Sequence, residues 1–551
     1  MTTLLDKYTL LPALLGAAFL LWPGLAWSLP ESGAAVAAAA PGNGPAAPAG
    51  SATVPRFYIQ EYRVEGGGHL LTRDETEAAV YPYLGPYRTP EDVEQARGAL
   101  EQAYRDKGFQ TVTVQVPAQH ARTGIITLQV VQGQIGRLNV IGSRYFSIDQ
   151  IKREAPSLQE GASPNFSQVT HDLVVLNQLS DRRVTPTLRA GEIPGTVDVD
   201  LNVKDTSPLH GSLEINNRYS ANTTPLRING SVSYDNLWQL EHSIGFSFQV
   251  SPEDPTQVKV FSGYYLARVP GLDWLSLIAQ GTSQDSSVNT LGGIGVVGNG
   301  DVVGGRAVIS LPQLKDFYHS ISLGFDYKHF DQNVVIAGES AVTPIVYYPF
   351  SAAYSGTWIG KGYETDLNSS VTFAVRELGS NVEQFDNNRH GADGSFIYYR
   401  GDISHTRDLP GGFQFFVKAQ GQAADKPLVN SEQFSGGGQG TVRGYLESEE
   451  LGDNGLFGST ELRTPSLGGD VLGKTVDDWR FYLFGEGGFL TLNDVLPEQQ
   501  EQYRLASVGM GTRLKLAGHY NGSFDVGLPL DNGTDTNAYE PQLTFRVWAE
   551  F

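Results

Sequence analysis

The sequence predicts a mainly β protein: a transmembrane antiparallel β-barrel preceded by two small α/β domains. The composition is the first reason, because 64 glycines, 25 tyrosines and 26 phenylalanines among 551 residues are typical of many strands, wide turns and aromatic belts at membrane surfaces. The second is an N-terminal segment with the features of a secretory signal. The third is the short apolar–polar alternation that fills the chain from about residue 206 to its end.

Composition also excludes several classes of protein. A chain without cysteine has no disulfide framework and no thiolate metal site. A formal net charge of −21 argues against binding to nucleic acid, which needs clustered Lys and Arg. Beyond the first thirty residues we find no uncharged apolar stretch near the roughly 18 residues that a membrane helix requires. Any crossing of a membrane is therefore expected to use strands.

Residues 1–28 are predicted to be a cleaved signal peptide. No charged residue occurs between Lys7 and Glu31, and the segment ends in Ala26-Trp27-Ser28, with small residues at the positions that a signal peptidase requires. The alternative is an uncleaved anchor helix. Prolines and glycines interrupt the apolar run and favour cleavage.

Residues 29–54 consist almost wholly of Ala, Pro, Gly and Ser and are predicted to be a linker. Such a composition cannot bury enough apolar surface to fold by itself. Residues 31–40 could form a short helix, so whether the segment contains a helix that plugs the barrel stays open.

Residues 55–135 follow the order strand, helix, helix, strand, strand. Thr72 and Glu75 form a capping-box start for the first helix. Thr89 begins the second helix, which stops at Gly108. Its apolar face consists of Val93, Ala96, Leu100, Ala103 and Tyr104. This face needs a sheet to cover, and alternating strands at 112–116 and 125–131 provide one.

Residues 136–205 repeat the same order. A strand at 138–140 is followed by a helix from Ser147 and a longer helix around Leu173. Two strands, near 184–188 and 197–203, close the unit. The chain therefore carries two copies of one α/β unit.

Three segments give these units a specific resemblance. They are Pro82-Tyr-Leu-Gly85, the helix end from Tyr104 to Phe109, and the run from Gly124 to Ile135. Together they look like the POTRA domains of outer-membrane transporters, and the resemblance covers both units. The alternative is a generic small α/β domain.

Residues 206–551 are predicted to form the barrel. Runs such as 244–250, 371–375, 413–417 and 524–528 place apolar residues on one face and Ser, Gln, Gly or Asp on the other. A soluble sandwich would turn the apolar face inward, whereas a membrane barrel turns it towards lipid. The secretory signal favours the barrel. So does the alternation from Leu543 to a terminal Phe551, which resembles the C-terminal signal for membrane assembly of barrel proteins.

Length allows about 14 to 18 strands in this region, at roughly ten residues per strand plus loops. A barrel of this size is too wide for its wall side chains to fill, so it encloses water or a plug.

The segment Val442-Arg443-Gly444-Tyr445 looks like the sixth-loop motif of a superfamily that includes two-partner secretion transporters and barrel-assembly proteins. The resemblance implies a barrel of 16 strands and a loop that folds back into the lumen. It also implies that Arg443 contacts an acidic residue of an F-x-D-x-G strand. The matching residues here are Phe484, Glu486 and Gly488.

Strand parity supports this pairing. Tyr482, Phe484, Glu486 and Gly488 share one face of the predicted strand, so Glu486 points to the lumen with the polar set. Glu replaces the usual Asp, which lengthens the reach by one methylene. A guanidinium in a confined lumen needs a carboxylate partner. The alternative is an exposed loop arginine without one.

Two nucleotide-binding patterns occur in unsuitable contexts. Gly468-x-x-x-x-Gly473-Lys474-Thr475 fits the P-loop, and Gly293-x-Gly295-x-x-Gly298 fits the dinucleotide fingerprint. Neither is followed by a predicted helix, so the first is expected to be a turn between strands and the second glycines in a strand and loop. We see no nucleophile elbow or zinc pattern, so we expect no catalytic residues, metal or cofactor, and no enzyme activity.

The resemblance as a whole is to the two-partner secretion transporters of the ShlB/FhaC/HecB haemolysin secretion/activation type. It implies a type V secretion protein in the outer membrane, with its POTRA domains in the periplasm. The implied cargo is one large secreted partner protein, unfolded in transit and moved without nucleotide hydrolysis. The other expected partners are outer-membrane lipid and, during biogenesis, the barrel-assembly machinery; the chain is expected to be monomeric and to bind no nucleic acid. Two alternatives are a barrel-assembly factor and a diffusion porin.

Overall fold

A computed structural model describes residues 55–120, 123–285, 299–336, 339–469, 473, 475–497 and 499–551. The predicted signal peptide, the linker and the Gly293–Gly298 pattern lie outside these residues. Among the described residues, no helix is both long enough and apolar enough to cross a membrane.

The first α/β domain contains a three-stranded sheet and two helices. Its elements are β1 (Phe57–Ile59), β2 (Glu61–Gly66), α1 (Arg73–Val80), β3 (Gly85–Arg88), α2 (Pro90–Asp106), β4 (Thr113–Gln115) and β5 (Ile125–Val131). The central strand β5 pairs in parallel with β2 and antiparallel with β4. The pairing of β1 with β3 was not predicted, because residues 57–64 read as one continuous strand in the sequence.

The helices of this domain begin at the capping residues that the sequence predicts. Thr72 accepts a hydrogen bond from the Glu75 backbone N–H, and the Glu75 carboxylate accepts one from the Thr72 N–H at 2.7 Å. Thr89 caps α2 in the same way with Asp92. The buried face of α2, which includes Leu100, joins the sheet residue Leu128 in one apolar core.

The second α/β domain repeats this arrangement. Its elements are β6 (Gln134–Ile141), α3 (Ile148–Arg153), α4 (Phe166–Leu176), β7 (Arg182–Ala190) and β8 (Thr196–Asp205). The last strand, β8, is again central, parallel to the first strand and antiparallel to the one before it. Strand β6 starts at Gln134, so the predicted boundary at 135/136 falls just inside this strand.

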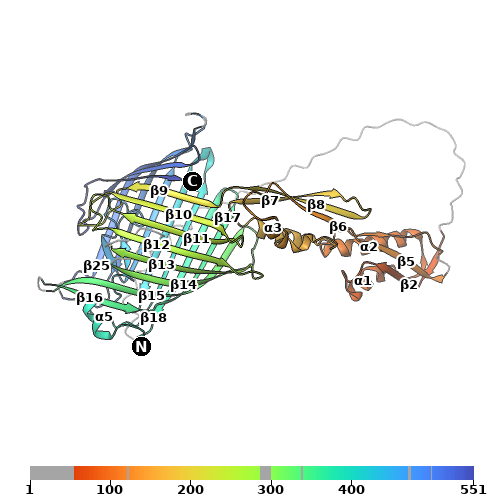
Figure 1. Cartoon of the computed structure of the whole chain (residues 1–551), viewed down its shortest axis with the longest axis horizontal. Helices are drawn as coiled ribbons and strands as arrows, with labels where there is room; N and C mark the ends of the chain where they lie inside the picture. The colour runs from red at the N-terminus through yellow and green to blue at the C-terminus, as the bar shows by residue number, and fades with distance from the viewer. Residues whose placement is uncertain are drawn as a thin grey trace, which may run out of the picture. The chain divides into compact units, whose positions relative to one another are not determined.

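The rest of the chain forms a closed antiparallel barrel (Figure 1). Its first half contains β9 (Leu209–Asn216), β10 (Arg227–Leu237), β11 (His242–Val250), β12 (Lys259–Arg268), β13 (Leu275–Asp285), β14 (Asn299–Ser310), β15 (Phe317–Ile336), β16 (Glu339–Tyr347), β17 (Phe350–Gly360) and β18 (Tyr363–Ala374). Its second half contains β19 (Phe396–Asp408), β20 (Gln414–Ala424), β23 (Asn454–Arg463), β24 (Val476–Thr491), β25 (Gln502–Leu516), β26 (Tyr520–Pro529) and β27 (Gln542–Glu550). β16 and β17 both pair with β15, along different parts of its length, and together they occupy one position in the ring. The barrel therefore has 16 strands.

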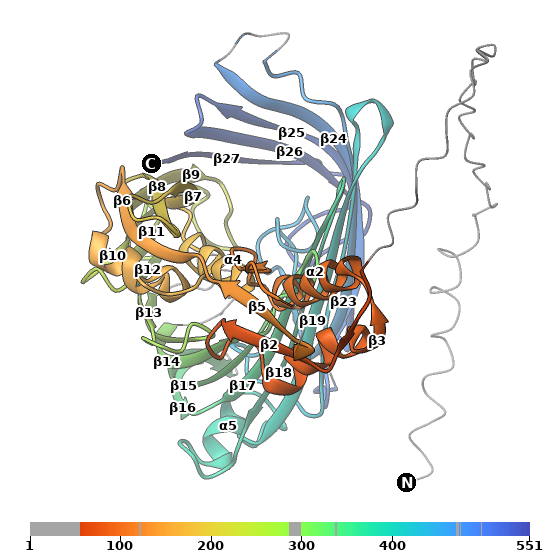
Figure 2. The same cartoon turned by 90° about the vertical axis from the view of Figure 1, so that its right-hand side faces the viewer.

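The barrel closes where its last strand meets its first. Residues 546–550 of β27 pair with residues 212–216 of β9, and the two strands lie side by side in Figure 1 and Figure 2. The terminal Phe551 extends this pairing, because its backbone exchanges hydrogen bonds of 2.9 and 3.0 Å with Gly211. Asn217 extends it at the other end, with its side chain bonded to the backbone of Leu543 and Phe545. Closure leaves no open edge for lipid to contact.

The wall of the barrel is apolar outside and polar inside. Phe246, Phe373 and Phe524 expose 40–48% of their surface on the outer face. Inner neighbours such as Gln249 and Asp525 are buried, at 1% and 2% exposed. The alternation therefore turns its apolar face outwards, as a membrane barrel requires and a soluble sandwich does not.

The P-loop-like segment lies between two barrel strands. Gly469 pairs with Gly473 across the connection from β23 to β24, and Val476 then begins a strand. A phosphate-binding loop needs a helix at this point. The prediction of a turn between strands is confirmed.

Candidate functional site

The connection between β20 and β23, residues 425–453, folds back into the barrel and carries the Val442–Tyr445 motif. Two short strands brace it, β21 (Phe434–Gly436) and β22 (Glu450–Gly452), which pair with each other. Val442 is fully buried. We call residues 425–453 the lumen loop.

Arg443 lies at the centre of a buried charge cluster on the inner wall. Its guanidinium bonds Glu486 of β24 at 2.5 Å, Glu461 of β23 at 2.8 Å and Asp525 of β26 at 3.1 Å. All four side chains are at most 4% exposed. The Arg443 backbone N–H also donates to Glu486, at 2.7 Å. One residue of the lumen loop is thus tied to three wall strands.

Two further arginines balance the charge of this cluster. Arg463 and Arg513 both bond Glu461, at 2.7 and 3.1 Å. With Arg443 they match the three carboxylates one for one. Hydrogen-bonded and charge-balanced pairs offset the desolvation that burying ions costs, whereas a lone buried charge is strongly unfavourable.

Each residue of the strand motif has a contact. The Phe484 ring lies against the Arg443 guanidinium, with 3.7 Å from its carbon to the ring centroid, an arrangement that favours a cation. Glu486 supplies the carboxylate and also accepts from the Ser459 hydroxyl at 2.8 Å. A Cβ on Gly488 would lie 2.1 Å from the Leu456 carbonyl oxygen, so only glycine fits beside β23.

The turn of the loop motif packs backbone to backbone on the wall. Gly444 has φ +97°, which favours glycine. A Cβ on Gly527 of β26 would lie 2.7 Å from the Gly444 nitrogen. The Tyr445 hydroxyl donates to the Asp531 carbonyl at 2.7 Å and lies 3.0 Å from the Ala506 carbonyl. Backbone contact and buried hydrogen bonds therefore hold the tip on the wall in addition to the ion pairs of Arg443.

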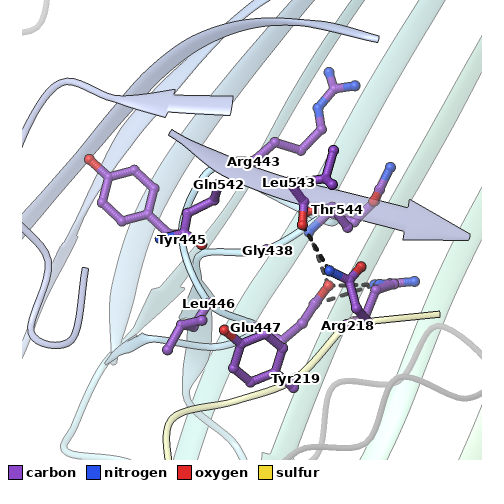
Figure 3. Close-up of a pocket in the computed structure, with 12 residues that line it drawn as sticks. Arg218, Tyr219, Gly438, Arg443, Tyr445, Leu446, Glu447, Gln542, Leu543 and Thr544 are labelled. Atoms are coloured by element: carbon purple, nitrogen blue, oxygen red, sulfur yellow. Dashed lines mark hydrogen bonds and ion pairs between the residues drawn. The ribbon is translucent and has the colours of Figure 1, made fainter. Parts of the chain in front are cut away.

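A second ion pair ties the loop tip to the closing strands of the barrel. Figure 3 shows Arg218, just beyond β9, and Glu447 pointing towards each other, and their closest atoms are 2.7 Å apart. The Glu447 backbone N–H donates to the Tyr219 carbonyl at 3.0 Å. A small pocket lies here, between the loop tip and residues 542–544 of β27. The lumen loop therefore contacts the segment that follows β9 as well as β23 to β26.

The sequence placed Arg443 and Glu486 together, and the structure brings them into contact. It did not identify Glu461, Asp525 or the Arg218–Glu447 pair as partners of the loop. Asp525 lies on the polar face of an alternating run, which was a usable signal for a lumen position. Alternation names a face of a strand, however, and many polar residues share that face.

Comparison with known proteins identifies the family of this chain. The model of the family described as haemolysin secretion/activation protein ShlB/FhaC/HecB matches residues 195–514, and the ShlB-type POTRA model matches residues 57–133. The first match covers more than half of the chain. The chain belongs to the ShlB/FhaC/HecB family. This membership makes it an outer-membrane transporter of two-partner secretion, with its POTRA region in the periplasm.

Two individual relatives, both transporters, are similar to this chain over most of its length. The heme/hemopexin transporter protein HuxB of Haemophilus influenzae is 21% identical over 87% of this chain and 84% of its own length. The outer membrane transporter CdiB of Dickeya dadantii is 22% identical over 78% of this chain and 77% of its own length. Both matches span the α/β region as well as the barrel.

Solved structures support the fold. The structure of CdiB from Escherichia coli aligns with a TM-score of 0.64 at 21% identity, over 92% of this chain and 93% of that one. BamA from Haemophilus ducreyi lacking POTRA domains 1–3 aligns with a TM-score of 0.54 at 13% identity, over 90% and 100%. Transporters and BamA share this architecture, so the fold alone does not separate them. The ShlB/FhaC/HecB family match does, and the predicted family, fold class and outer-membrane location are confirmed.

Proposed function

We propose that this transporter recognises one large exported protein, unfolded in the periplasm, and passes it through the barrel to the cell surface without nucleotide hydrolysis. Both α/β domains are assigned to recognition, the second as a further POTRA domain because it repeats the strand order of the first. Each sheet has its last strand at the centre and other strands at its edges. An extended polypeptide can add to such an edge with main-chain hydrogen bonds and little demand on its sequence.

The observation that carries the proposal is the lumen loop itself. A segment tied to β23, β24 and β26 through Arg443 obstructs the path that a polypeptide would take. The ties through Arg443 are ionic and polar, so water or a passing chain can replace them. Displacement of the loop opens the path, and folding of the exported protein outside the cell makes the movement one-way. The other partners we assign are membrane lipid and the assembly machinery that inserts the barrel, and the functional unit is a monomer without enzyme activity.

Arg443→Glu tests this function. It places a carboxylate among Glu461, Glu486 and Asp525, so the loop can no longer dock on the wall. We expect secretion to fall at least about 100-fold, because transport requires the loop to alternate between its docked and its released state. The measurement is the amount of exported protein in the medium when the transporter is co-expressed with a large secreted protein from a neighbouring reading frame, tested as its cargo. Heat-dependent gel mobility reports barrel assembly, which we expect to stay normal.

Arg306→Ala is the matched control. Arg306 of β14 pairs with Asp326 of β15 within the wall, at 2.7 Å, and these strands stay joined by their backbone ladder without it. Normal secretion by Arg443→Glu would contradict the gating role. Deletion of residues 55–205 tests the porin alternative, because a porin would keep its conductance to small ions without these domains and would need no exported partner.

A further inference from the structure

The lumen loop also contains a buried carboxylate, Glu432, that is not part of the Arg443 cluster. Its side chain is 1% exposed. The Lys328 ammonium of β15 donates to it at 2.5 Å. The Tyr347 hydroxyl of β16 donates at 2.7 Å and the Tyr398 hydroxyl of β19 at 2.8 Å. Like Arg443, Glu432 is a single loop residue bonded to three wall strands.

The two clusters lie on different walls of the barrel. Glu432 contacts β15, β16 and β19, whereas Arg443 contacts β23, β24 and β26. In the closed strand order, β15 and β26 are on opposite sides of the ring. Only ten residues separate Glu432 from Arg443 in the sequence. The loop is therefore fixed to two separate stretches of the barrel wall.

An apolar cluster backs the Glu432 end. Leu428 and Val429 of the loop are at most 1% exposed and pack in one cluster with Tyr347. Phe385 of α5 (Val382–Asn388), in the connection between β18 and β19, joins them, with its ring 5.8 Å from that of Tyr347. This cluster lies at the end of the barrel opposite the first residue of β9, because β18 runs in the same direction as β9 and α5 follows the last residue of β18. Tyr347 belongs to both the apolar cluster and the Glu432 site, so the two are one unit.

Lys328 is the part of this site that can be exchanged without disturbing the apolar cluster. Its ammonium lies 5.9 Å from the Tyr347 ring centroid and is 11% exposed as a side chain. With Lys328 in place, the Glu432 carboxylate has a cation and two hydroxyl donors, which offsets its desolvation. Without it, the carboxylate is a buried anion held by hydroxyls alone. The docked state of the loop should then become much less stable relative to the released state.

We infer that Glu432, with Lys328, is a second positioning residue for transport, which holds the lumen loop on β15, β16 and β19 independently of Arg443. The inference rests on the proposed gating function. Release of Arg443 loosens the tip but leaves the first part of the loop attached to β15, β16 and β19. Full opening requires both ends to leave.

Ion conductance of the purified full-length protein in planar lipid bilayers tests the inference without any exported partner. We expect Lys328→Met to raise the fraction of time in the fully open state about tenfold or more, and Lys328→Arg to stay near wild type because the charge is kept. We expect Arg443→Ala alone to give mainly partial conductance. The double variant Arg443→Ala, Lys328→Met should conduct more than either single variant. Asp326→Asn, which removes an ion pair within the wall, is the control expected to match wild type.

A wild-type conductance for Lys328→Met in a correctly folded barrel, or full opening by Arg443→Ala alone, would overturn the inference.

A second test uses the absence of native cysteine. The double variant Lys328→Cys, Glu432→Cys, cross-linked by a short bis-maleimide, should not secrete. Lys328→Cys or Glu432→Cys alone, treated in the same way, should still secrete. Normal secretion by the cross-linked protein would also overturn it. A failure of the proposed function would give a different result. Arg443→Glu would then secrete normally, although Lys328→Met would still open the channel.

Discussion

The α/β domains and the barrel bury different kinds of side chain. In the first domain the core is apolar throughout, with Leu100 and Leu128 fully buried. In the barrel, Leu483 and Met510 face outwards at 59% and 61% exposed, while Arg443 and Glu461 are among the least accessible residues. Water cannot replace an apolar core contact, so a domain stays folded. Water can replace a polar contact, so a polar lumen can hold a loop firmly and still release it.

The largest expected effect is on the buried charges of the lumen. Glu461→Gln leaves Arg443, Arg463 and Arg513 facing two carboxylates, and breaking a buried pair in this way costs about 3–5 kcal/mol. We expect faster hydrogen exchange in residues 437–449 of the full-length protein, with the barrel still folded. Asp478→Asn is the control, since Asp478 pairs with Arg480 on the same strand at 22–43% exposure. Unchanged exchange in Glu461→Gln would show that apolar contacts and backbone packing hold the loop instead.

A smaller effect separates the two kinds of exposed surface. Leu483→Arg on the outer face of β24 should destabilise the barrel in liposomes by about 2–4 kcal/mol, because the side chain faces lipid. Ile193, in the second α/β domain, is exposed to a similar degree at 67%, but it faces water. Ile193→Arg should therefore change stability by no more than about 0.5 kcal/mol. Guanidinium unfolding of both variants measures the difference, and equal effects would contradict the assignment of the outer face to lipid.

The smallest expected effect concerns an exposed charge of the first α/β domain. A hydrogen bond from Lys107, at the end of α2, and hydrogen bonds from Thr72 lower the pKa of Glu75 to about 2. Because this pKa is lower in the folded state, Glu75 adds stability above its unfolded value of about 4.3, and this stability disappears as the pH falls towards 2. We expect Glu75→Gln to flatten the acid side of the stability profile of this domain slightly. Hydrogen exchange between pH 5 and 2 measures it, and a profile identical to wild type would contradict the role of the pair.

Local patterns in the sequence determined the elements of this protein. Thr72 with Glu75 and Thr89 with Pro90 mark helix starts that depend on neighbours within one turn. Alternation determined which side of β24 faces the lumen, because a strand sends successive side chains to opposite faces whatever its partners are. The family motif then singled out Arg443 and Glu486 from other polar residues on lumen faces.

Only the tertiary structure decided which residues meet across the lumen. Asp525 lies 82 positions from Arg443 in the sequence, and Lys328 lies 104 positions from Glu432. Their contacts depend on the register of every strand between them and on closure of β27 onto β9. A one-residue slip in any pair would turn a lumen side chain towards lipid. The second attachment of the lumen loop and the pairing of Arg218 with Glu447 arise from this closure, which no short stretch of sequence encodes.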